Sequence, residues 1–501
     1  SAIVHRLEPP QCGARDETPT LVASGRAERL RKIERGWPWS SSLGDINSSA
    51  AEATARTRGR PAAKARSSLA TACKLLIAAE PSVVSVVAME KRPSASMIVM
   101  IVWLAAAPAA VVSAPEDVSR ATNELGMALY RKVAETDPKG SNIFMSPVSV
   151  AAILGMVQLG SRGRTRQQIN AALEGGAGSN RLARGSNAAD SDDIAAGFGE
   201  LFKDLNSEKG YELRLASAVF LATGLPIFER YKRDLEKHFA SGVYSANFAG
   251  NAREAADDVN SWVRDMTEDR IPEIIERPLP PSAPMLVLNA VYFKGLWQTP
   301  FKPEDTITGE FFNEGGSRPV PVQMMRQKGE FVYALSESLD AHILEMPYVG
   351  DRVDLVIVLP RRRDGLRELE EKFSLEAARE PLAAALPRKV DVWLPKFQMQ
   401  QAYSLMGPLL ALGVRDVFST RDANLTGVSS KRPLALDEVL HKALLDVDEK
   451  GTEAVALSSG IIRHSKTPGG EVEFKADHPF LFFIEDVRTQ TLLFLGRLQR
   501  V

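Results

Sequence analysis

One run of the chain is compatible with only a narrow range of folds. Residues 285–297 read Met-Leu-Val-Leu-Asn-Ala-Val-Tyr-Phe-Lys-Gly-Leu-Trp and are apolar at nearly every position. A strand that lies between two layers reads as a continuous apolar run, whereas a strand with one wet face alternates. We therefore expect residues 285–297 to form a strand whose sheet is covered on both faces. Asn289 is polar within this run, and a buried amide needs hydrogen-bond partners.

A second run, residues 449–468, combines the signals of a strand with those of a loop. The alternate residues Thr452, Ala454, Ala456, Ser458 and Gly460 are all small, and a strand places alternate residues on one face. No proline occurs from Glu449 to Thr467, as a central strand requires. Pro468-Gly-Gly470 then marks an exposed turn. The run fits an ordinary surface loop, or a segment that exchanges between loop and strand.

The first part of the chain predicts a leader. Residues 1–88 contain no methionine and show no sustained amphipathic period. Met89 is followed by three charged residues, a short apolar run at residues 97–107, and Val-Ser-Ala ending at Ala114. This order is typical of a secretory signal, and the apolar run is too short to span a bilayer. We predict a signal peptide at residues 89–114 and a secreted, extracellular protein. Residues 1–88 are then upstream translation or a disordered extension.

Charge and cysteine content exclude several classes of protein for residues 115–501. The whole chain has a formal net charge of −1, of which residues 1–114 contribute about +6, leaving about −7 for the remainder. Nucleic-acid binding favours a basic surface, so no nucleic-acid partner is expected. A glycosaminoglycan partner has no support from the net charge, but a local basic patch leaves it open. Both cysteines, Cys12 and Cys73, precede the predicted cleavage. Disulfides and thiolate metal sites are therefore excluded for residues 115–501.

The motifs of common enzymes are absent from the sequence. There is no Gly-x-Ser-x-Gly elbow, no His-Glu-x-x-His pair and no phosphate-cradling glycine loop. The histidines after residue 114 are scattered: His238, His342, His441, His464 and His478. We expect no enzymatic activity, no metal and no cofactor.

Local patterns predict several elements. Ser146-Pro147 is a helix start, with a capping hydroxyl followed by proline at the first helical position. Residues 320–325 and 331–335 read as separate strands. Residues 160–168, with Arg162, Arg164 and Arg166, read as a solvated basic turn.

Several segments resemble the serpins, the serine protease inhibitor family. They are His-Lys-Ala-Leu-Leu-Asp-Val-Asp-Glu-Lys-Gly-Thr-Glu-Ala at 441–454, Phe-Lys-Ala-Asp-His-Pro-Phe at 474–480, Leu-Phe-Leu-Gly-Arg at 493–497, Asn-Ile-Phe-Met-Ser-Pro-Val-Ser at 142–149, and the run at 285–297. The resemblance covers roughly residues 116–501. It implies an α+β serpin fold in a serpin domain at residues 115–501, with three β-sheets, about eight or nine helices and an exposed reactive-centre loop. It also implies that residues 259–271 form the helix overlying the main sheet.

The resemblance also implies roles for individual residues. Those of an inhibitory hinge fall on Glu449, Lys450, Gly451, Thr452, Glu453, Ala454, Val455, Ala456, Leu457 and Ser458. Those of the shutter, where the main sheet parts, fall on Ser146, Ser149, Asn289 and His441. Asn289 is expected to bond to His441, and Trp297 resembles the breach residue at the top of the sheet. Counting sixteen residues from Glu449, the family's usual spacing, places the reactive-centre bond between Ser465 and Lys466, with Arg463 as an alternative specificity residue.

The activity implied is inhibition of serine proteases as a suicide substrate, with trypsin-like or elastase-like targets trapped in a covalent complex. We expect a monomer that does not bind membranes. Val455 and Leu457 depart from the alanine-like residues usual in such hinges, and both face outward, so insertion is expected to be slower but permitted. The alternative is a non-inhibitory serpin that serves as a carrier, a storage protein or a chaperone. Asn424-Leu-Thr426 is an acceptor sequence for N-glycosylation.

Overall fold

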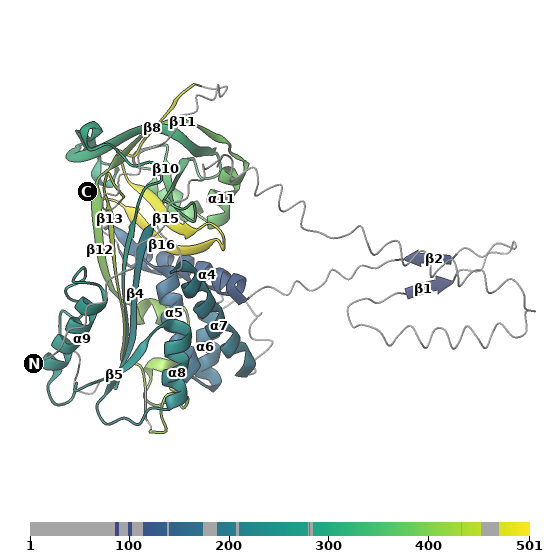
Figure 1. The fold of residues 1–501 in the computed structure, drawn as a ribbon, viewed down its shortest axis with the longest axis vertical. Coiled ribbons are helices and arrows are strands. Elements are labelled where there is room, and N and C mark those ends of the chain that lie inside the picture. The colour runs from purple at the N-terminus through teal and green to yellow at the C-terminus, as the bar shows by residue number, and fades with distance from the viewer. Residues whose placement is uncertain are drawn as a thin grey trace, which may run out of the picture. The chain divides into compact units, whose positions relative to one another are not determined.

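The computed structural model describes residues 86–89, 99–102, 114–137, 140–173, 188–206, 210–278, 280, 284–431, 433–451 and 470–501. The chain divides into two units, residues 1–110 and 111–501. In the first unit, β1 (Val86–Met89) pairs antiparallel with β2 (Val99–Val102). The second unit contains all other described elements (Figure 1).

The described residues of the second unit contain nine α-helices, in line with the eight or nine that the family resemblance implied. They are α4 (Ala114–Glu135), α5 (Pro147–Gly160), α6 (Gly163–Leu173), α7 (Ala188–Leu205), α8 (Glu229–Phe239), α9 (Ala252–Met266), α10 (Leu366–Lys372), α11 (Leu375–Ala384) and α12 (Met406–Ala411). The same described residues also contain three short 3₁₀ helices: η2 (Pro303–Asp305), η3 (Asn313–Gly315) and η4 (Asp416–Phe418).

The strands that the structure describes in this unit form a five-stranded and a nine-stranded sheet. The smaller runs in the order β12 (Phe397–Ser404), β13 (Glu438–Val447), β6 (Met285–Gly295), β4 (Tyr211–Ala222), β5 (Gly242–Ala246). The larger runs β14 (Val472–Lys475), β11 (Pro387–Pro395), β8 (Val320–Ser336), β9 (Ala341–Pro347), β10 (Val353–Pro360), β15 (Phe480–Asp486), β16 (Thr491–Leu498), β3 (Ile143–Met145), with β7 (Ile307–Phe311) on β8. The fold is α+β, as predicted.

The long strand β8 joins two of the three expected sheets into one hydrogen-bonded sheet. It pairs with β7 near its start and with β9 near its end. The prediction of separate strands at residues 320–325 and 331–335 was wrong. The polar residues between them pair without a break against β11, from Met324 opposite Pro395 to Val332 opposite Pro387.

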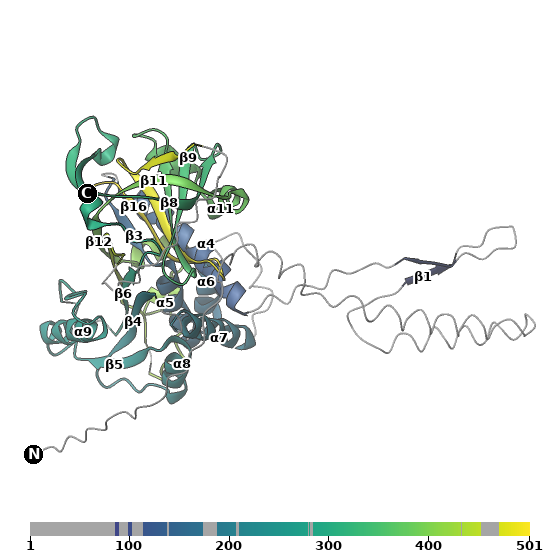
Figure 2. The same ribbon diagram turned by 45° about the horizontal axis from the view of Figure 1, so that its top comes forward.

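Both faces of β6 are covered, which confirms the first expectation from the sequence. Met285, Val287, Val291 and Phe293 join the main core. The alternate residues Leu286, Leu288, Ala290 and Tyr292 pack with apolar residues of α9 in a second cluster. Figure 2 shows α9 on one side of β4 and β6, and α5 to α8 on the other.

The helix that overlies the sheet lies earlier in the chain than residues 259–271. Asn251 caps its start, because its side-chain oxygen accepts from the Glu254 N–H at 3.2 Å. Its last residue is Met266, since Glu268 and Asp269 both adopt positive φ, 50° and 60°. Two consecutive residues in the left-handed region cannot continue a right-handed helix.

The predicted helix start at Ser146-Pro147 is confirmed, whereas the predicted basic turn was wrong. Ser146 caps α5, every residue of which is buried. Gly163 begins α6 within the supposed turn. Arg162 donates to the carbonyls of Leu159 and Ser161 at 2.9 and 2.6 Å, and Arg164 pairs with Asp416. These arginines therefore close the end of α5 and fasten α6.

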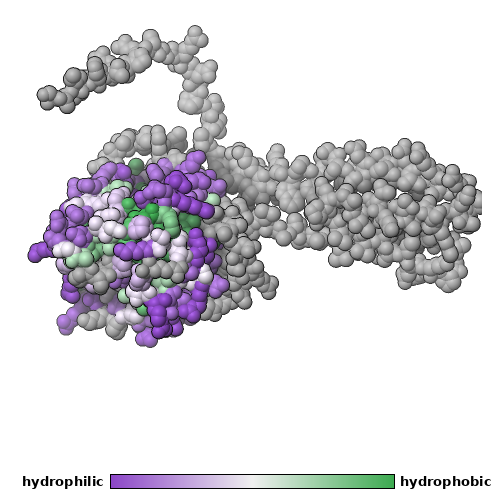
Figure 3. Space-filling model, turned by 90° about the horizontal axis from the view of Figure 1, so that it is seen from below, coloured by the Kyte–Doolittle hydropathy of each residue, from purple (hydrophilic) through white to green (hydrophobic). Residues whose placement is uncertain are grey.

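One face of the described residues is largely polar. Figure 3 shows this face, on which hydrophilic side chains surround a smaller apolar area. Among the described residues, no helix combines the length and the apolar character needed to cross a membrane. The same part of the chain contains no group of three or more His, Cys, Asp or Glu side chains placed to hold a metal ion.

Candidate functional site: the seam between β6 and β13

The five-stranded sheet contains a parallel pair of strands close to the point where the described residues end at Gly451. β13 pairs parallel with β6 from Glu438 opposite Leu286 to Leu445 opposite Phe293, while β4 pairs antiparallel with β6 and β12 antiparallel with β13. The chain leaves the end of β13 at Val447. A strand running back between β13 and β6 would be antiparallel to both, and antiparallel pairing is slightly the more stable. We call this β6–β13 boundary the seam.

A row of polar side chains crosses the seam at one level. Ser217 of β4 lies opposite Asn289 of β6, Asn289 opposite His441 of β13, and His441 opposite Tyr403 of β12. Asn289 Nδ2 donates to Ser217 Oγ at 2.9 Å. The Tyr403 ring stacks on His441 with centroids 6.5 Å apart. Because directly opposed residues share a face of the sheet, the row follows from strand register.

His441 is a neutral imidazole with both nitrogens engaged. It has no exposed surface. The Ser146 N–H donates to His441 Nε2 at 3.0 Å, so Nδ1 carries the ring proton and donates to Asn289 Oδ1 at 3.0 Å. Burial lowers the pKa of His441 to about 3. His441 therefore ties β13 to β6 and to the start of α5.

The two serines complete this cluster. Ser146 Oγ lies 2.8 Å from Ser149 Oγ and donates to the carbonyl of Leu493 on β16 at 2.8 Å. The structure thus brings together all four side chains that the sequence placed at the shutter. Sequence reasoning missed Ser217, Tyr403 and Leu493, because each is unremarkable in its own segment and only strand register brings it to the row.

Trp297 packs at the end of the seam where the chain leaves β13. Its ring stacks on Tyr348 with centroids 4.6 Å apart and is almost fully buried. The indole Nε1 donates to the carbonyl of Asp448 at 2.9 Å, and the Trp297 N–H donates to the carbonyl of Lys450 at 3.3 Å. Trp297 therefore holds the chain as it leaves β13.

The carboxylate of Glu449 makes the second attachment at this end. Lys396 Nζ lies 2.8 Å from Glu449 Oε2, and Thr306 Oγ1 donates to Oε1 at 3.1 Å. Burial raises the pKa of Glu449, but these hydrogen bonds outweigh it and leave the pKa below its usual value. Gly451 follows with a φ of +74°, and a Cβ there would lie 2.3 Å from the carbonyl oxygen of Gly295. The turn after Glu449 therefore requires glycine.

Several predicted site residues lie outside the described residues. They are Thr452, Glu453, Ala454, Val455, Ala456, Leu457 and Ser458 of the hinge, and Arg463, Ser465 and Lys466 of the reactive centre. Asn424 is described and half-buried, and its Oδ1 accepts from Thr426 Oγ1 at 2.7 Å.

Comparisons with known proteins agree on one family. A family model described as "Serpin (serine protease inhibitor)" matches residues 120–501. Leukocyte elastase inhibitor of Sus scrofa is 36% identical over 393 residues, 76% of this chain and 99% of the relative. Iripin-2 of Ixodes ricinus is 33% identical over 388 residues, 76% of this chain and 93% of the relative. The crystal structure of uncleaved ovalbumin matches with a TM-score of 0.67 and 30% identity, over 77% of this chain and all of that chain. The chain belongs to the serpin family.

Proposed function

We propose that this serpin inhibits serine proteases as a suicide substrate. The hydroxyl of the protease serine attacks the carbonyl of Ser465, an ester forms, and the amine of Lys466 leaves with a proton. The loop upstream of the cut then inserts at the seam and carries the attached protease with it. The ester is trapped when insertion is faster than its hydrolysis.

The observation that carries this proposal is the parallel seam at the end of β13. The chain that leaves Val447 needs only to reverse at Gly451 to run antiparallel to both β13 and β6. Strand addition of this kind satisfies backbone groups on both sides. About a dozen new hydrogen bonds at roughly 1 kcal/mol each would favour insertion. This gain must exceed the cost of separating Asn289 from His441, whose side chains lie 3.0 Å apart across the seam.

The hinge sequence is suited to insertion into the sheet, because one set of alternate side chains is small enough to face the core. In the register with Thr452, Ala454, Ala456 and Ser458 facing inward, only small side chains meet the core. Val455 and Leu457 then face outward, where they slow insertion without blocking it. The names of the relatives, leukocyte elastase inhibitor among them, agree with a protease inhibitor.

The proposed targets are trypsin-like or elastase-like. Lys466 or Arg463 at the cut would suit a pocket that binds a cation, whereas Ser465, the residue given by the count from Glu449, would suit an elastase-like pocket. We further propose secretion after cleavage at Ala114, glycosylation of Asn424, and a monomeric inhibitor that forms covalent complexes with its targets.

Incubation of residues 115–501 with trypsin, elastase and chymotrypsin tests the proposal. A denaturing gel should show a band at the summed mass of inhibitor and protease, and mass spectrometry of the released peptide would identify the cut. Ala456→Arg places a charge on the inward face and should convert the inhibitor into a substrate. Val455→Arg, its outward-facing control, should still trap.

Clean cleavage without the heavier band for every protease would refute inhibition of these classes. The non-inhibitory serpin, a carrier, storage protein or chaperone, would then be the better account. Its cut form should show no rise in thermal stability, whereas insertion should raise stability sharply.

A further inference from the structure

The downstream end of the reactive loop rests on a weakly paired strand. β14 (Val472–Lys475) pairs parallel with β11 over four residues, from Val390 opposite Val472 to Trp393 opposite Lys475. It is the edge strand of the nine-stranded sheet. A pairing this short orders a loop end poorly unless side chains reinforce it.

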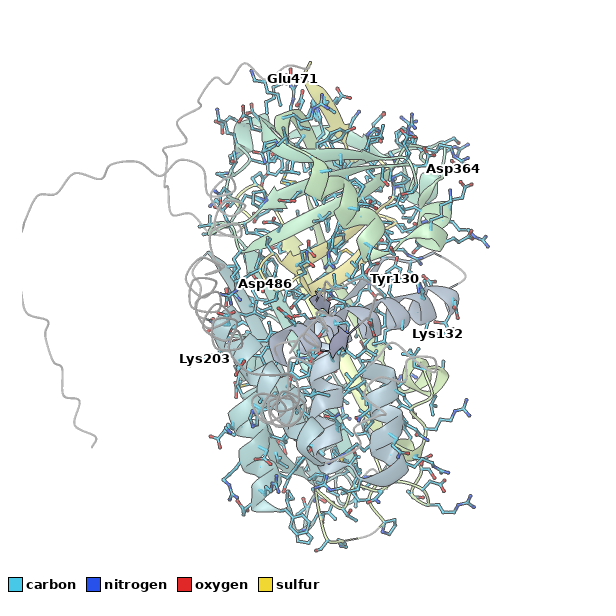
Figure 4. The ribbon with its side chains drawn as sticks, turned by 90° about the vertical axis from the view of Figure 1, so that its right-hand side faces the viewer. Tyr130, Lys132, Lys203, Asp364, Glu471 and Asp486 are labelled. Carbon is cyan, nitrogen blue, oxygen red and sulfur yellow. The ribbon has the colours of Figure 1, made fainter. Side chains whose placement is uncertain are left out.

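Lys328 of β8 reinforces it across the intervening strand. Its Nζ lies 2.7 Å from Glu471 Oε1, immediately before β14, and 3.3 Å from Asp391 Oδ2 on β11 (Figure 4 labels Glu471). The hydrogen bond to Glu471 is the main cause of a raised pKa for Lys328. Arg388 NH2 also approaches the carbonyl oxygen of Gly470, at 3.4 Å.

The position of Lys328 is itself fixed by a buried carboxylate. Asp391 is 7% exposed and accepts two hydrogen bonds from Arg326, at 3.0 Å from Nε and 2.7 Å from NH2. The Arg326 guanidinium in turn lies over the Trp393 ring, 4.4 Å from its centroid. A bidentate pair that also stacks on an aromatic ring is well ordered. The ordered Asp391–Arg326–Trp393 group therefore holds Lys328 in position to contact Glu471.

We propose that Lys328, assisted by Arg388, is a positioning residue that presents the reactive bond for attack and has no part in trapping. This inference rests on the proposed function. Before the cut, the loop is held at both ends, by Trp297 and Lys396 upstream and by Lys328 and Arg388 downstream.

The two ends of the reactive loop act at different steps of the reaction. When the peptide bond after Ser465 breaks, the downstream end stays with β14 and is no longer joined to the inserting segment. The Lys328 contact can therefore change the rate at which the acyl-enzyme forms. It cannot change the competition between insertion and hydrolysis that follows.

The full chain carrying Lys328→Met, Glu471→Gln or both tests this assignment, with trypsin and elastase as probes. Lys389→Met is the matched control: Lys389 is exposed on β11 and, within the described residues, has no ion-pair partner. Two quantities are measured, the second-order rate of protease inhibition and the number of inhibitor molecules consumed per protease trapped.

We expect Lys328→Met to slow inhibition by about twofold to fivefold relative to the control, in line with the strength of exposed ion pairs, without changing the number consumed. The double variant should be no slower than the single ones, and the difference should shrink in high salt. A rate equal to that of Lys389→Met, or a rise in the number consumed, would overturn the assignment.

A second readout distinguishes this inference from the proposed function. Amide exchange of residues 472–475 should be faster in Lys328→Met than in Lys389→Met, whether or not any protease is trapped. If the wild type traps no protease but the two variants still differ in exchange, the proposed function is contradicted and the positioning role of Lys328 is kept. Equal exchange in the two variants would contradict the positioning role of Lys328 itself.

Discussion

His441 should make the stability of this serpin fall on acidification. The imidazole is buried without exposed surface, and its Nε2 already accepts the Ser146 N–H. A proton added there would break that bond and place a charge in the core. Burial lowers the pKa of His441 from 6.5 to about 3, whereas in the unfolded chain it titrates near its ordinary value.

The sign and size of the effect follow from proton linkage. Between about pH 6.5 and pH 3 the unfolded state binds one more proton at His441 than the folded state, so stability falls as the pH falls through that window. Each pH unit inside the window costs about 1.4 kcal/mol. The contribution of His441 is almost complete at pH 7 and should be smaller by about 2 kcal/mol at pH 5.

A His441→Gln variant isolates this contribution. Glutamine can accept the Ser146 N–H and donate to Asn289 Oδ1, but it does not titrate. Carboxylates with lowered pKa values, such as that of Glu449, also lose stabilising contacts in acid. They are present in both proteins, so the difference in the free energy of unfolding between the two removes them.

Urea unfolding at pH 7, 6 and 5 is the measurement. The wild type should lose about 2 kcal/mol relative to His441→Gln between pH 7 and pH 5. A difference that stays constant over this range would refute the neutral, buried imidazole and with it the hydrogen-bond assignment across the seam.

Three further substitutions test the site and its surroundings. Ser146→Ala removes the cap of α5 and the bond to the Leu493 carbonyl; the free energy of unfolding should fall by about 2 kcal/mol, and an unchanged denaturation midpoint would contradict this. Asp269→Gly relieves a φ of +60° and should raise stability by about 1 kcal/mol in the same assay, whereas a loss would show that the Asp269 side chain stabilises the turn. Glu449→Gln removes the ion pair with Lys396, one of the contacts that hold the loop upstream of the cut; protease inhibition should slow by about twofold to fivefold, and a rate equal to that of the wild type would count against this contact.

Local signals in the sequence predicted those parts of the site that depend on a single segment. Ser146-Pro147 contains its own helix start, and α5 begins there. The continuous apolar run at residues 285–297 shows in itself that both faces are covered, as the two clusters on β6 confirm. These predictions succeeded because the burial pattern of a strand and the capping of a helix are encoded by residues that lie next to one another in the sequence.

Features that depend on distant partners could not be predicted from the residues alone. Ser217 and Tyr403 join the polar row only through strand register. Arg162 looked solvated because its acceptors are backbone carbonyls, which every residue carries. The polar centre of β8 looked like a break between strands because the partner that continues the pairing, β11, lies far along the chain.

The two faces of β13 explain why the seam is both specific and separable. His441 and Lys442 are adjacent and both buried, so they point to opposite faces, His441 to the polar row and Lys442 to the carbonyl of Glu273, which its Nζ meets at 2.6 Å. Burying such groups costs stability that apolar side chains would supply, but each finds its partner in one register only. A slip of one residue would exchange their faces and leave both unpaired. The polar row therefore fixes the register of β13 against β6. It also makes their pairing less stable than that of two apolar strands. A strand inserting between β6 and β13 requires such a pairing, because it must separate them.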